Sequence, residues 1–211
     1  METNIDRVGA TLGRRSLLKI LSTAPVAASF ALTEAEAQEA HNHAAAARQT
    51  AQKTGAAFTP KFFTPAEYQT VGILSDLIIP ADDRSGGAID AGVPEFMDYI
   101  LTEYPDGQTS IRGGLAWLDA ECERRFAKDF VSSSDAQRKQ VLDDIAWPKK
   151  ARPEMSQGVA FFNRFRDFTA SGFFSSKMGT EDLHYIGNTP QPAWNGCPPE
   201  ALAKLGVSYT A

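Results

Sequence analysis

The chain has 211 residues, a net charge of −5 at neutral pH and 43% hydrophobic residues, which is enough for one globular domain with a substantial core. The acidic balance argues against a nucleic-acid partner, because proteins that bind nucleic acids use basic patches for most of their affinity. No basic cluster marks the chain for an anionic membrane surface either.

The first segment has the pattern of an export signal. Arg14 and Arg15 precede an apolar run from residue 20 to 32, and Ala35-Glu36-Ala37 supplies small residues at the cleavage positions. A basic leader, an apolar core of about 7–15 residues and a small-x-small site define a secretory signal, and paired arginines direct a precursor to the pathway that moves folded proteins. We expect residues 1–37 to be a twin-arginine signal peptide, cleaved after Ala37. An amphipathic N-terminal helix is the alternative.

This leader predicts a periplasmic mature protein of about 174 residues. Its apolar run is shorter than the roughly 20 residues of a membrane span, and no second run of that length follows. We therefore expect no direct membrane insertion of the mature chain, and membrane association only through partners.

The mature chain divides into a linker and one helical domain. Residues 38–57 are small and polar with no apolar stripe, which predicts a flexible linker or a fraying helix. Residues 58–211 form the domain, in which Thr64 and Glu67 make a capping box around Pro65. Apolar stripes and caps predict helices at about 65–78, 93–101, 110–130, 135–147, 157–170 and 200–205. The fold class is therefore all-α, a compact bundle of about five to six helices.

The last forty residues, 172–211, form an irregular C-terminal arm that is rich in Gly, Pro and aromatic residues. Large aromatics in such a segment are typical of an interface, because regular helix packing does not account for them. The alternative is that they fold back as a lid over the core. The candidates for partner contact are Phe173, Phe174, Tyr185, Trp194 and Cys197.

Cofactor motifs are missing from the sequence: there is no G-x-G-x-x-G, P-loop, C-x-x-C or H-E-x-x-H. His41 and His43 lie in an alanine-rich segment where solvated side chains are expected, and His184 stands in a loop. We predict no catalytic, cofactor-binding or metal-binding residue in this chain.

Two cysteines, Cys122 and Cys197, remain to be explained in an oxidising compartment. A bridge between them would tie the arm to the helical body and is the favoured interpretation. A bridge from Cys197 to a partner and two free thiols are the alternatives.

A group of carboxylates, Asp82, Asp83 and Asp90, supports the competing hypothesis of an independent periplasmic enzyme. A turn that ends a helix, with an ion pair to Arg84, accounts for the first two more simply. A small-ligand-binding protein that uses the late aromatics is a third hypothesis.

Several motifs resemble the gluconate 2-dehydrogenase subunit 3 family in their order and spacing. They are residues 62–67 (FFTPAE), 76–83 (DLIIPADD), 86–88 (GGA), 91–98 (AGVPEFMD) and 185–188 (YIGN). The resemblance implies a non-catalytic small subunit of a periplasmic sugar, sugar-acid or glucoside dehydrogenase. Its catalytic partner would be a flavoprotein of the glucose–methanol–choline oxidoreductase (GMC) type that holds FAD, with an iron–sulfur cluster as a further candidate. A cytochrome c subunit with haem c often completes such complexes. The small subunit would carry the export signal for the flavoprotein and support its maturation.

Overall fold

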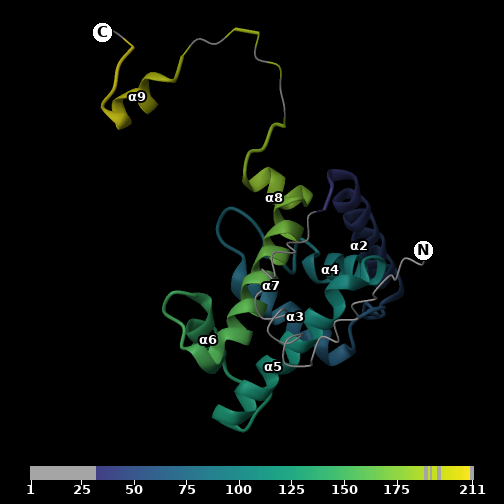
Figure 1. Cartoon of the computed structure of the whole chain (residues 1–211). Coiled ribbons are helices and arrows are strands. Elements are labelled where there is room, and N and C mark those ends of the chain that lie inside the picture. Colours follow the sequence, from purple (N-terminus) through teal and green to yellow (C-terminus); the bar gives the residue numbers. More distant parts are fainter. Residues whose placement is uncertain (1–31, 188–189, 191, 194–195, 210–211) are drawn as a thin grey trace, which may run out of the picture.

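The computed structural model describes residues 32–187, 190, 192–193 and 196–209. Within these residues the chain is helical with no strand, which confirms the all-α prediction (Figure 1). The α-helices are α2 Glu34–Thr54, α3 Pro65–Ile78, α4 Val93–Glu103, α5 Gln108–Phe126, α6 Asp135–Ala146, α7 Ser156–Phe174, α8 Lys177–Asp182 and α9 Pro199–Leu205, and two 3₁₀ turns are η1 Pro105–Gly107 and η2 Pro153–Met155.

Capping residues fix where the helices begin. Thr64 caps α3 with its hydroxyl on the backbone N–H of Glu67, whose carboxylate accepts from the backbone N–H of Thr64 in return. Ser134 starts α6 in the same way. Each box satisfies two N–H groups that the first helical turn leaves without partners. The sequence pattern therefore locates these starts correctly.

Helix α7 is the central element of the bundle and contacts α3, α4, α5, α6 and α8. Its buried face carries Phe161, Phe162, Phe165 and Phe168, and Phe168 meets Phe96 of α4 edge-on at 6.0 Å between ring centroids. The edge-on arrangement is favoured by the quadrupoles of the two rings, and both rings fill part of the core.

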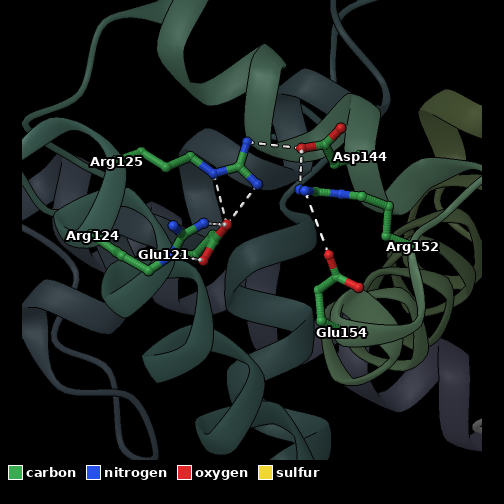
Figure 2. A network of polar contacts seen from close by, with 6 residues as sticks. All are labelled: Glu121, Arg124, Arg125, Asp144, Arg152 and Glu154. Carbon is green, nitrogen blue, oxygen red and sulfur yellow. Dashed lines mark hydrogen bonds and ion pairs between the residues drawn. The ribbon is translucent and has the colours of Figure 1, made fainter.

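A polar network closes the end of the bundle where α5, α6 and η2 meet (Figure 2). Glu121 accepts from Arg124 and Arg125, and hydrogen bonding by Arg124 is the largest cause of its lowered pKa. Arg125 reaches Asp144 of α6 at 2.8 Å, and Asp144 also pairs with Arg152 at 3.6 Å. Because Glu121 is buried, losing its arginines would leave a charge without compensation. We therefore assign this network to the architecture.

Residues 38–57 are not the flexible linker of the first expectation; the alternative, a helix, is closer, but this helix is packed against the body. Most of them belong to α2, which packs along α4, and Arg48 anchors it by donating to the carbonyls of Ile89 and Asp90 at 2.9 and 2.8 Å. The buried face consists of Ala37, Ala40 and Ala44. Alanines bury little apolar area, so the sequence shows no hydrophobic stripe, yet they let two helices approach closely.

The C-terminal arm also differs in part from the predicted irregular segment. Helix α7 continues to Phe174, and α8 follows it directly. The junction requires Gly179, because a Cβ at this position would lie 2.1 Å from the carbonyl oxygen of Phe173. Only the part of the arm after α8 leaves the body, and it carries α9 away from the bundle (Figure 1).

Candidate partner-binding surface

Large apolar side chains are exposed along the part of the arm after α8, which we call the apolar arm (residues 183–209, as far as the structure describes them). Ile186 is 81% exposed, and α9 has no buried residue. The exposed apolar residues of the apolar arm are Leu183, Tyr185, Ile186, Leu205, Val207 and Tyr209. They fall in two groups, residues 183–186 beside α8 and residues 205–209 at the end of α9. Exposed large apolar side chains gathered in this way are typical of surfaces that bind a partner.

The apolar arm leaves the body at a defined point. Ser176 is the N-cap of α8, and its hydroxyl accepts from the backbone N–H of Gly179. The helix ends at Asp182, and His184, two residues further on, has a left-handed conformation with φ 51°. The backbone N–H of Tyr185 closes this turn on the carbonyl of Thr180 at 2.9 Å. Asp182 also receives the Nε of Arg84 at 3.1 Å. His184 thus belongs to the turn that ends α8.

A groove of about 1330 Å³ runs between α2, the turn before α4 and the α7–α8 junction, and we call it the α2–α8 groove. One wall is the face of α2 that includes His41 and Arg48, and the other includes Phe174 and Met178. Leu183 and Tyr185 also line it, so the groove adjoins the start of the apolar arm. The lining mixes polar and charged side chains with apolar ones, as protein–protein interfaces commonly do.

His41 lies in this groove and links α2 to α7. Its Nε2 is 2.8 Å from the Ser175 hydroxyl, and its ring stacks on Phe96 at 4.6 Å. Burial lowers the pKa of His41, which favours the neutral ring. The expectation of a solvated side chain is wrong for His41, because α2 is folded against the body.

The predicted interface residues have different positions. Phe173 is 1% exposed and belongs to the core, so it is not available to a partner. Phe174 is 40% exposed and Tyr185 is 66% exposed, and both line the α2–α8 groove. Trp194, like Arg14 and Arg15 of the predicted export signal, lies outside the described residues. The structure therefore brings Phe174 and Tyr185 together.

The two cysteines are free thiols in this structure, so the favoured intramolecular bridge is not formed. Cys122 is fully buried in α5, where burial raises the pKa of its thiol. Cys197 lies on the apolar arm, and its backbone N–H donates to the hydroxyl of Tyr209 at 2.8 Å.

Two carboxylates of the competing enzyme hypothesis, Asp82 and Asp90, accept hydrogen bonds from backbone N–H groups. Asp82 accepts from the N–H groups of Arg84 and Ser85, and the Ser85 bond is the largest cause of its lowered pKa. Asp90 accepts from the N–H of Gly87 at 3.0 Å. The ion pair of Arg84 goes to α8 rather than to its neighbouring aspartates.

Sequence reasoning missed part of this surface. Leu183 and Ile186 belong to it but are not among the predicted contact residues. Their place next to Tyr185, in a short segment that Gly187 ends, is a sequence signal that could have indicated them. The α2–α8 groove had no sequence signal, since it depends on α2 being folded. Among the described residues, no group of three or more acidic, histidine or cysteine side chains could hold a metal. Nor does any described helix combine the length and apolarity that crossing a membrane demands.

The fold and this surface define a small helical protein that presents an apolar arm and an open groove, as a subunit that binds other proteins does. The chain belongs to the gluconate 2-dehydrogenase subunit 3 family, whose sequence model matches residues 65–192, more than half of its length. The family takes its name from one subunit of a multi-subunit dehydrogenase, which implies partner subunits. No curated protein and no solved structure matches the chain.

Proposed function

We propose that this chain is the small, non-catalytic subunit of a periplasmic FAD-dependent dehydrogenase complex that oxidises a sugar, sugar acid or glucoside. Its partner is a GMC-type flavoprotein that holds the FAD, and a cytochrome c subunit with haem c is a further candidate member. The twin-arginine leader, with Arg14 and Arg15, directs export of both proteins, and the small subunit supports maturation of the flavoprotein. Family membership supports the role as a subunit.

The observation that carries the proposal is the apolar arm. Its exposed side chains on a segment outside the bundle would be unfavourable in an isolated soluble protein, since apolar surface in water costs about 25 cal/mol per Å². A partner that buries the apolar arm and the adjoining α2–α8 groove removes this cost. Aromatic residues such as Tyr185 are the typical anchors of such contacts.

An independent enzyme is the weaker candidate. Asp82 and Asp90 are engaged with backbone N–H groups of their own loop, where they stabilise turns as such carboxylates commonly do.

We expect Tyr185→Ala to weaken binding of the flavoprotein by roughly thirtyfold, because truncating a buried interface aromatic costs about 2 kcal/mol or more. Trp194→Ala should act in the same direction. The measurement is the amount of flavoprotein that co-purifies with the tagged subunit, together with the melting temperature of the isolated subunit.

Trp147→Ala is the matched control, because Trp147 is 63% exposed, close to the value for Tyr185, but lies at the end of α6. It should leave co-purification unchanged. If Tyr185→Ala lowered the melting temperature strongly and left partner binding intact, the residue would serve the fold of the subunit rather than the interface.

A further inference from the structure

The predicted cleavage site of the leader lies inside a folded helix. The small-x-small pattern at residues 35–37 forms the first turn of α2, so the bond between Ala37 and Gln38 is helical. The apolar run of the leader ends at Leu32, immediately before Thr33, the N-cap of α2. No stretch of extended chain therefore separates the leader from the folded domain.

Hydrogen bonds within the capping box and from Tyr104 hold the first turn of α2 in place. The Thr33 hydroxyl accepts from the backbone N–H of Glu36 at 3.3 Å, and the Glu36 carboxylate accepts from the backbone N–H of Thr33 at 2.7 Å. Tyr104, which follows α4, donates its hydroxyl to the same carboxylate at 2.9 Å. A capping box of this kind contributes about 1 kcal/mol to a helix. Opening the turn breaks all of these bonds.

Packing protects the residues around the bond as well. Ala37 is 8% exposed, while Ala40 and Ala44 are 0% and 4% exposed. One turn further on, His43 stacks on Tyr99 of α4 at 4.4 Å. A peptidase needs several residues around its target bond in an extended conformation, so it cuts a folded segment only after local opening. Here the opening would detach the first two turns of α2 from α4.

We propose that α2 shields the Ala37–Gln38 bond, so that the folded subunit is not cut there and keeps residues 33–37 in its mature form. The inference rests on the proposed function insofar as the leader is an export signal. In this proposal the buried alanines Ala37, Ala40 and Ala44 also have a function: they keep α2 packed on α4, so that a peptidase does not reach the Ala37–Gln38 bond. Cleavage at this bond requires a chain in which α2 is not docked.

A direct test is the intact mass of the subunit purified from the periplasm, combined with sequencing of its N-terminal peptide. We expect an N-terminus at or before Thr33. A chain that begins at Gln38 would overturn the proposal. A subunit that is never exported contradicts the proposed function instead, so the two failures are distinguishable.

Purified signal peptidase provides a second test that does not depend on export. A synthetic peptide of residues 28–45 should be cut after Ala37 at least about tenfold faster than the folded full-length chain. Equal rates would show that α2 gives no protection. A peptide that is not cut would show that the bond resists for a reason other than folding, which equally overturns the proposal.

Two substitutions, one on the buried face and one on the exposed face of α2, test whether packing or the added charge itself changes the rate of cleavage. Ala40→Glu places a charge where the side chain is 0% exposed and should loosen α2, since a buried unpaired charge is strongly unfavourable. Ala46→Glu adds the same charge on the exposed face. We expect faster cleavage after Ala37 in the first variant alone, and the same rate in both would contradict shielding by packing.

Discussion

Replacing Arg14 and Arg15 by lysine is expected to leave both this subunit and its flavoprotein partner in the cytoplasm. Lysine keeps the positive charge but lacks the planar, five-donor guanidinium group, so the substitution removes the recognised chemistry and preserves the charge of the leader. The twin-arginine signal is an address read by a receptor. If one signal serves two proteins, its loss should reduce the periplasmic amount of both by nearly the whole. Fractionation followed by immunodetection of each chain measures this.

Arg7→Lys is the matched control, because it makes the same exchange in the same leader outside the arginine pair. It should leave export unchanged. Periplasmic flavoprotein in cells that carry the double-lysine subunit would refute shared export, whatever happens to the subunit itself.

The second large effect concerns two adjacent glycines of α5 that face opposite environments. A Cβ at Gly114 would lie 1.8 Å from the ring of Phe161, which is part of the core, whereas a Cβ at Gly113 would meet nothing within 4 Å. Overpacking a core typically costs about 1–3 kcal/mol, while alanine is favoured over glycine in a helix by about 1 kcal/mol. Gly114→Ala should therefore destabilise the subunit and Gly113→Ala should stabilise it.

Thermal unfolding of the isolated subunit tests this pair, with each variant serving as the control for the other. For a domain of this size about 1 kcal/mol corresponds to a shift of about 2–4 °C, so we expect Gly113→Ala to raise the melting temperature by that amount. Gly114→Ala should lower it by at least as much. A rise in both variants would mean that α5 and α7 do not approach each other as described.

The helical body could be predicted because its signals are local. Caps at Thr64 and Ser134, and stripes of Leu, Ile and Phe, specify α3 to α7 within a few residues of the observed ends. Helix α5 ends before the predicted residue 130 because Ala127 adopts a left-handed conformation with φ 55°. Alanine is not typical of a left-handed helix end, so the sequence does not predict this terminus.

The docking of α2 onto α4 could not be predicted, because the contacts that hold it are not local. Its buried side chains are alanines, and it is attached by two stacked imidazole rings, His41 on Phe96 and His43 on Tyr99, and by Arg48 on the turn before α4. These depend on residues about fifty positions away. The α2–α8 groove exists only because α2 is docked, so it could not be predicted from the sequence.

The sequence predicts that the arm carries exposed aromatics, but not at which residue the arm leaves the body. Its composition correctly indicated exposed aromatics, and Tyr185 is among them. The Gly- and Pro-rich composition of residues 172–211 places Phe173 on the same surface, whereas α7 continues through Gly172 and buries Phe173 in the core. Tertiary packing overrides the local propensity of a single glycine here.

The most direct test of the account is purification of the native complex through a tag on this subunit, followed by its absorbance spectrum and reduction of an artificial electron acceptor with a panel of sugars, sugar acids and glucosides. We predict a co-purifying flavoprotein, flavin absorbance and substrate-dependent reduction, while the isolated subunit is colourless and inert. Flavin bound stoichiometrically to the isolated subunit, or a subunit that purifies alone from its native source, would contradict the proposed role.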